Sequence, residues 1–277
     1  MEARLHQSNS AGATRSDLGP NHFSVTSLGD GRTQFIGSRL PAKSCVLFVH
    51  GFHGKALETW KGFDTIALQR NELKETDLIF FGYDGLQSNA LASASFLFDL
   101  VDDVLGPGRA LQRVKTVAPA YEKCVIAAHS LGAVVTRWVL LRAYHEKRPW
   151  LDKVRYLLFA PAHCGAVVVD SVSELLGANV ISKLIGGAAK ATLPLLNELA
   201  PGSVILKTLE EQTRVAMAAG CGALRAKRVV IAEYEEVVSN LPFPGDPFPT
   251  AIRDAHHTTV CKPDEYSDVI EFVVELL

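Results

Sequence analysis

The sequence has no long apolar run, no excess of one charge and no closely paired cysteines, and each absence excludes a class of protein. No stretch reaches the roughly eighteen continuous apolar residues that a transmembrane helix requires. Residues 1–20 contain no apolar signal-peptide core, so we expect a polar tail and no secretory signal. A net charge of −2 without a basic cluster gives no electrostatic basis for binding nucleic acid or an anionic membrane.

The five cysteines are odd in number and scattered, without a C-x-x-C pair. Tight His/Cys pairs at zinc-ligand spacing are also missing, so the sequence does not predict a metal site. Cys45 and Cys124 lie in apolar, strand-like runs, where cysteine is commonly a small buried hydrophobic residue. We therefore expect reduced thiols in a cytoplasmic protein.

Short apolar runs alternate with helical patterns along most of the 277 residues. The predicted strands cover 44–52, 77–85, 123–130, 153–163 and 227–235. Helical patterns cover 56–70, 90–105, 131–147 and 265–277. Strands that are apolar throughout are typical of sheets covered by helices on both faces. The alternation therefore predicts an α/β fold with a mostly parallel central sheet.

Two segments depart from this alternation. Residues 23–37 predict an antiparallel hairpin at the sheet edge, turning at Asp30-Gly31. Residues 164–226 contain helical segments rich in Ala, Leu and Gly, and no clear strand. We interpret them as a helical insertion between the fourth and fifth parallel strands, either a cap or lid over the substrate or extra helical packing. Residues 21–277 are predicted to form one domain containing this insertion.

The stretch AHSLGAVVTRWVLL, residues 127–140, places Ser130 between a strand and a helix. A nucleophile on such a sharp turn requires strained backbone angles and small neighbours. Gly132 and Ala128 supply the small positions, although Ala128 departs from the usual G-x-S-x-G pattern. The alternative is an ordinary serine that caps the helix.

The earlier stretch FVHGFHG, residues 48–54, ends the first predicted parallel strand. Acyl transfer requires two N–H groups that stabilise an oxyanion, one following the nucleophile and one from the loop after this strand. The backbone amides of Phe52 and Leu131 are the candidate pair, and Gly51 lets the chain turn toward the site. His50 is interpreted as an orienting residue and not as a base.

An acid and a histidine follow in the C-terminal part of the chain. Glu235 and Glu236 lie at the end of the last predicted strand, and Glu235 is preferred because the residues after it resemble an acid–x–x–Val turn. His257 is the candidate base, with His256 as the alternative. The chain order of serine, acid and histidine is that of the α/β-hydrolase triad.

Together these motifs resemble the α/β-hydrolase superfamily, and more narrowly the lipase-like serine esterases related to GPI inositol-deacylase and the serine-active-site-containing proteins. The family's Thr-Pro-His-x-Gly-Ser turn reads PAHCGA here, keeping His163, for which we expect a structural role. The family ending His-x-x-x-Cys-Lys favours His257 over His256. The matching stretches are FVHGFHGKALETW, FFGYDG, AHSLGAVVTRWVLL, APAHCGA, ELAPGSVILKTL and HTTVCKP.

The resemblance implies a serine hydrolase that cleaves a small-molecule or lipid-like carboxylic ester through an acyl-enzyme. Ser130 would attack, His257 would transfer the proton, and Glu235 would orient the imidazole. No metal or organic cofactor is required by this chemistry. Two alternatives stay open: a catalytically silent binding or signalling module on a hydrolase scaffold, and an amide hydrolase or acyltransferase that uses the same triad.

Overall fold

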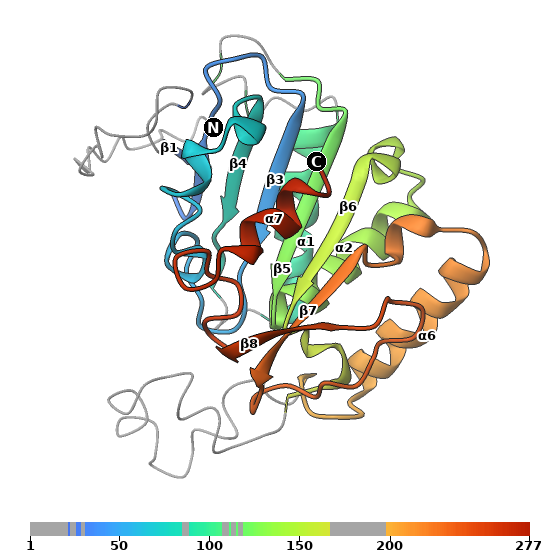
Figure 1. Cartoon of the computed structure of the whole chain (residues 1–277). Helices are drawn as coiled ribbons and strands as arrows, with labels where there is room; N and C mark the ends of the chain where they lie inside the picture. The colour runs from blue at the N-terminus through green and yellow to red at the C-terminus, as the bar shows by residue number, and fades with distance from the viewer. Residues whose placement is uncertain are drawn as a thin grey trace, which may run out of the picture.

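The computed structural model describes residues 22, 26–28, 31–84, 89–106, 111, 115, 119–166 and 198–277 (Figure 1). The predicted polar tail, residues 1–20, lies outside the described residues. Within the described residues, eight strands form one sheet in the order β1-β2-β4-β3-β5-β6-β7-β8. The fold class predicted from the sequence, a mostly parallel α/β sheet, is therefore confirmed.

Two antiparallel strands form one edge of the sheet. β1 (Thr26–Leu28) and β2 (Thr33–Ile36) pair as a hairpin, and β2 continues antiparallel onto β4. Gly31 lies in this turn with φ 87°, a left-handed conformation that glycine adopts without strain. The predicted edge hairpin is thus present.

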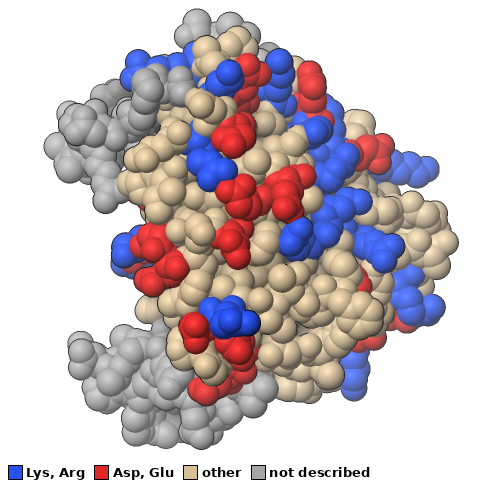
Figure 2. All heavy atoms as spheres, viewed as in Figure 1, with Lys and Arg blue, Asp and Glu red and all other residues tan. Residues whose placement is uncertain are grey.

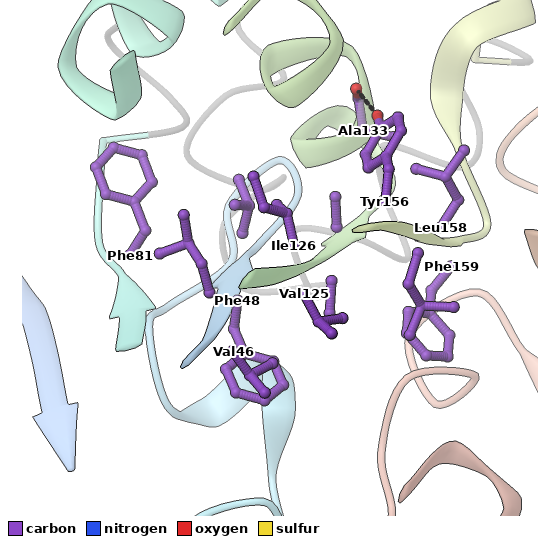
Figure 3. Packing of buried hydrophobic residues seen from close by; sticks show 14 of the residues in the cluster. Val46, Phe48, Phe81, Val125, Ile126, Ala133, Tyr156, Leu158 and Phe159 are labelled. Carbon is purple, nitrogen blue, oxygen red and sulfur yellow. Dashed lines mark hydrogen bonds between the residues drawn. The ribbon is translucent and has the colours of Figure 1, made fainter. Parts of the chain in front are cut away.

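The other six strands are parallel, and their carboxyl ends lie along one edge, toward the bottom of Figure 1. They are β3 (Ser44–Val49), β4 (Thr76–Phe81), β5 (Lys123–His129), β6 (Val154–Phe159), β7 (Arg228–Tyr234) and β8 (Thr250–His256). The central strands are almost wholly buried, as expected for a sheet with helices on both faces. Figure 3 shows Phe48, Val125 and Ile126 packed in this core.

Helices cover the two faces of the sheet. α1 (Ala90–Leu105) and α2 (Leu131–His145) pack against each other behind the sheet in Figure 1, and α6 (Val204–Ala218) packs on α2. α7 (Asp268–Val274) lies in front. Short 3₁₀ helices are η1 Glu58–Trp60, η2 Ala67–Gln69, η3 Asn71–Leu73, η5 Pro149–Lys153, η6 Ala162–Cys164 and η8 Gly222–Leu224.

The predicted helix over 56–70 is wrong. This segment contains the short turns η1 and η2, and Gly62 between them has φ 103°, which ends any α-helix. A Cβ at Gly62 would lie 2.8 Å from the backbone nitrogen of Asp264, so the chain passes close to the C-terminal region there. Trp60 and Leu68 are both buried, and their spacing is that of a helix, but the segment that carries them consists of irregular turns.

The predicted insertion over 164–226 is described only in part, because residues 167–197 lie outside the described residues. The described part contains α6 and η8, which are helical as expected. The amide of Ala166 donates to the carbonyl of Leu199 at 2.9 Å, so the chain before and after the gap meets at one place. A cap over the substrate stays a prediction.

The face of the molecule in Figure 2 carries charges of both signs. Figure 2 shows acidic and basic side chains beside one another over much of the visible face. Among the residues that the structure describes, no helix has both the length and the apolar composition needed to cross a bilayer.

Candidate active site

Ser130 lies on a strained turn between β5 and α2. Its backbone angles are φ 54° and ψ −120°, in the positive-φ region that non-glycine residues rarely adopt. Its amide donates to the carbonyl of Phe159 at 3.0 Å, and its carbonyl accepts from the amides of Ala133 and Ala162. The side chain forms no capping hydrogen bond to α2, so the serine does not act as an ordinary helix cap.

Small residues around Ser130 let α2 approach β3 closely. A Cβ at Gly132 would lie 2.3 Å from the carbonyl oxygen of Val49, which is a direct backbone clash. Gly51 is also constrained, because its Cβ would lie 2.7 Å from that of Ser130. Ala128 is fully buried and pairs in register with Val49. The turn therefore requires glycine after the serine and accommodates alanine before it.

The loop after β3 lies beside this turn. The amide of Gly54 donates to the carbonyl of Gly51 at 3.1 Å, which closes a tight turn with Phe52 inside it. His53, the next residue in the turn, has φ 54°. Leu131 is the first residue of α2, directly after Ser130. The two amides proposed as oxyanion donors therefore belong to segments that meet at Ser130.

His50 holds the loop through both ring nitrogens. Its Nδ1 lies 2.8 Å from the Gly51 carbonyl, and its Nε2 accepts from the Tyr83 amide at 3.4 Å. The ring stacks on Tyr83, whose hydroxyl donates to the His50 carbonyl at 2.8 Å. Burial lowers the pKa of His50 to about 4, which matches a neutral imidazole with one N–H donor. His50 is thus placed to orient the loop.

Glu235 and His257 form a buried pair. The Nδ1 atom of His257 lies 2.9 Å from Oε1 and 3.0 Å from Oε2 of Glu235. Glu235 Oε1 also accepts from the amides of Val237 and Val238, at 2.9 and 3.0 Å, so the acid–x–x–Val turn is formed. The Glu235 side chain has 0% exposure and that of His257 has 4%.

The alternative acid and the alternative histidine lie elsewhere. Glu236 is exposed. His256 is also exposed, at the end of β8, with its ring 5.4 Å from that of Tyr234. The geometry therefore pairs Glu235 with His257.

His257 presents its second ring nitrogen inside the protein. Nε2 is buried and hydrogen-bonds to none of the described residues. The His257 ring lies 4.8 Å from that of His129, which directly precedes Ser130, and the His257 carbonyl is 2.8 Å from Nε2 of His129. An imidazole whose Nδ1 is fixed by a carboxylate can exchange a proton through Nε2 with a hydroxyl that comes within hydrogen-bond distance.

His163 belongs to a separate buried cluster. Its Nε2 accepts from Nε of Arg137 at 3.1 Å. Arg137 also donates to the Leu224 carbonyl and to Oδ2 of Asp246, and its guanidinium lies over the ring of Phe243. Burial, followed by the Arg137 charge, lowers the pKa of His163. These contacts fit the structural role expected for His163.

Three buried polar residues near the site were not predicted. His129 lies within the serine motif, and its place before Ser130 was the available signal. Arg137 is the charged residue among the buried residues of α2, and a buried charge requires a buried partner. Tyr83 lies in the matching stretch FFGYDG, but nothing in the sequence indicated its contact with His50. Within the described residues, no group of three or more His, Cys, Asp or Glu side chains is placed to hold a metal ion.

Comparison with known proteins identifies the fold. No protein-family model matches the sequence, and no curated protein matches it. A peroxisomal α/β-hydrolase of Saccharomyces cerevisiae is similar in structure, with a TM-score of 0.51, 8% identity and coverage of 88% of this chain and 81% of that chain. A thermostable esterase of Pseudomonas putida gives a TM-score of 0.50 at 14% identity, covering 95% and 83%.

The chain therefore has the α/β-hydrolase fold. The narrower resemblance to GPI inositol-deacylase and its relatives stays a prediction.

Proposed function

We propose that this protein is a serine hydrolase of carboxylic esters. The observation that carries the proposal is the buried Glu235–His257 pair, whose imidazole ring lies 4.8 Å from that of His129, the residue before the strained Ser130. A strained serine after a parallel strand is the setting of the nucleophile in this fold. The esterase among the similar structures catalyses the same class of reaction.

Each residue has a defined role in the proposed reaction. Ser130 Oγ attacks the ester carbonyl carbon while Nε2 of His257 accepts its proton, and Glu235 stabilises the imidazolium through Nδ1. The amides of Phe52 and Leu131 stabilise the negative oxygen of the tetrahedral intermediate. His257 then protonates the departing alcohol, which leaves an acyl-enzyme on Ser130.

Water completes the cycle. Water attacks the acyl carbonyl while His257 takes a proton from it. His257 returns that proton to Ser130 Oγ when the carboxylic acid product leaves. The Glu235–His257 pair and the two amides stabilise the charges that develop in these steps. The proposed reaction therefore uses groups of this chain, the ester and one water molecule.

The acyl part of the substrate is proposed to be apolar and lipid-like. The segment between β7 and β8 follows Glu235 and carries two strongly exposed hydrophobic residues, Leu241 and Phe248. We expect a series of p-nitrophenyl esters to give higher kcat/KM for acyl chains of eight or more carbons than for two to four. A preference for two to four carbons would contradict the lipid-like substrate and leave the ester chemistry standing.

Replacing the nucleophile tests the proposed reaction. Ser130→Ala is expected to lower kcat on a p-nitrophenyl ester by roughly 10⁴- to 10⁶-fold, as removal of a triad nucleophile does. Ser95→Ala, at an exposed serine of α1, is the matched control and is expected to retain wild-type activity. Activity of the Ser130 variant within tenfold of wild type would contradict the assignment.

A fluorophosphonate probe separates a hydrolase from a silent binding module. The probe is expected to label wild-type protein and the Ser95→Ala control, and not Ser130→Ala. Folded wild-type protein that resists labelling would favour the binding module. Product analysis with added alcohol or amine distinguishes hydrolysis from acyl transfer.

A further inference from the structure

His129 links the strand of the proposed nucleophile to the backbone of the proposed base. Its side chain is buried at the carboxyl end of β5, and its Nε2 lies 2.8 Å from the carbonyl oxygen of His257. A carbonyl oxygen only accepts, so Nε2 carries the proton and donates. Burial and the adjacent His257 lower the pKa of His129 to about 3, which keeps the ring neutral with this one N–H.

The ring of His129 is held between three segments. It lies 4.8 Å from the His257 ring and meets the edge of the fully buried Trp60 at 6.5 Å. A Cβ at Gly51 would lie 3.2 Å from its Nδ1, so the loop after β3 passes directly against it. Its position is therefore fixed by packing on several sides.

The sheet order explains why such a link matters. Ser130 follows β5 and His257 follows β8, and two strands, β6 and β7, separate these in the sheet. Glu235, which directly follows β7, holds Nδ1 of the His257 imidazole. This contact does not connect His257 to the turn that carries Ser130. The hydrogen bond from His129 spans 128 residues of sequence and makes that connection directly.

We propose that His129 is a positioning residue, whose Nε2–H bond to the His257 carbonyl holds the base in register with Ser130. The proposal rests on the proposed function for its kinetic consequence. Proton transfer between hydroxyl and imidazole requires hydrogen-bond distance, and a displacement of about 1 Å can cost about 10²-fold in rate. Substrate binding does not involve this bond, so its loss is expected to act on kcat and not on KM.

Two substitutions of similar length separate donation from packing. His129→Gln places an amide N–H near the position of Nε2, whereas His129→Met fills similar space without a donor. We expect His129→Met to lower kcat on a p-nitrophenyl ester by about 10- to 100-fold with KM within threefold of wild type. His129→Gln is expected to stay within about threefold of wild type in kcat.

The outcomes distinguish positioning from core filling. Equal kcat losses in both variants, or wild-type kcat in both, would overturn the proposal. If His129→Met does not fold, ¹⁵N-histidine NMR of the wild type and of His129→Gln tests the hydrogen bond instead. We expect a slowly exchanging proton on Nε2 of His129 in the wild type, and an unchanged His257 Nδ1–H signal in the glutamine variant. A His129 protonated on Nδ1 alone would overturn it.

Failure of the proposed function is visible separately. If the wild-type protein hydrolyses no ester and is not labelled by fluorophosphonate, the proposed ester hydrolysis is contradicted. The NMR measurement still tests the His129–His257 bond in that case, because it needs no turnover.

Discussion

Glu235 and Glu236 are adjacent carboxylates in different surroundings, and they provide a matched comparison. Glu235 is buried and accepts from three N–H groups, those of His257, Val237 and Val238, whereas Glu236 is exposed. A glutamine at 235 keeps the shape but loses the charge that stabilises an imidazolium. We expect Glu235→Gln to lower kcat/KM by roughly 10³- to 10⁴-fold, and Glu236→Gln to leave it within about threefold.

Steady-state kinetics on a single ester measures both variants. Circular dichroism shows whether each is folded. Equal losses in the two variants, or a loss confined to Glu236→Gln, would contradict the pairing of Glu235 with His257.

Glycine is required at position 132 because the backbone of β3 and the following loop approaches it closely, and not because its φ is positive. An added Cβ would lie 2.3 Å from the Val49 carbonyl oxygen and 2.5 Å from that of His50, and backbone atoms cannot move aside easily. We expect Gly132→Ala to lower the free energy of unfolding by about 3 kcal/mol or more. Gly222→Ala has no atom within 4 Å of its Cβ and is the control, expected within about 0.5 kcal/mol of wild type. Urea denaturation measures both.

At the scale of elements, the central strands could be predicted because their sequences are apolar throughout. β3, β5 and β6 lie within the predicted ranges, since complete burial leaves an unbroken apolar run. β8 was missed. It is an edge strand in which only Ile252 and Ala255 are buried, so neither a continuous nor an alternating pattern marks it.

Parts of the candidate site could be predicted where a short sequence motif specifies a local backbone conformation. The turn after Glu235 and the ending near His257 led to the pair that the structure shows hydrogen-bonded. The contact of His129 with the His257 carbonyl and that of Arg137 with Asp246 join segments more than one hundred residues apart. Such contacts follow from the sheet order, which a single sequence does not specify.

Arg137 joins α2, η6, η8 and the loop between β7 and β8. Its guanidinium is fully buried, and it donates to Asp246 at 2.5 Å, to His163 and to the Leu224 carbonyl. Breaking a buried pair by removing one partner leaves an uncompensated charge. We expect Arg137→Met to lower the free energy of unfolding by about 3 to 5 kcal/mol, measured by urea denaturation.

The double variant tests whether the unpaired charge causes that loss. Arg137→Met with Asp246→Asn removes both charges and is expected to recover part of the stability, since the amide oxygen of asparagine can still accept from the Ala226 amide. A double variant less stable than Arg137→Met alone would show that packing, and not the buried charge, dominates at this cluster.

At the scale of the whole molecule, the parallel sheet gathers residues that are far apart in sequence. Phe52, Ser130 and Glu235 each follow the carboxyl end of a parallel strand, and His257 directly follows the last one. The carboxyl ends of parallel strands lie along one edge of the sheet, and α/β proteins place their ligand-binding and active sites at that edge. The chemistry proposed here therefore depends on the order and twist of the sheet as much as on any single motif.

Buried neutral histidines are expected to make the whole fold sensitive to acid. Burial lowers the pKa of four of them, to about 4 for His50 and about 3 for His129, and in the same direction for His22 and His163. Below about pH 6.5 the unfolded chain binds protons that the folded chain does not, so stability falls as pH falls. Each such group contributes a slope of up to about 1.4 kcal/mol per pH unit until its folded pKa is reached.

Urea denaturation at intervals between pH 7.5 and 4.5 measures this dependence. We expect the free energy of unfolding to be nearly constant above pH 7 and to decrease progressively toward pH 4.5. His50→Gln removes one of the buried groups and is expected to flatten the slope relative to wild type, whereas His145→Gln, at an exposed histidine of α2, is the control. Stability that rises as the pH falls from 6.5 to 4.5 would contradict neutral imidazoles in the core, because protonation would then favour the folded state.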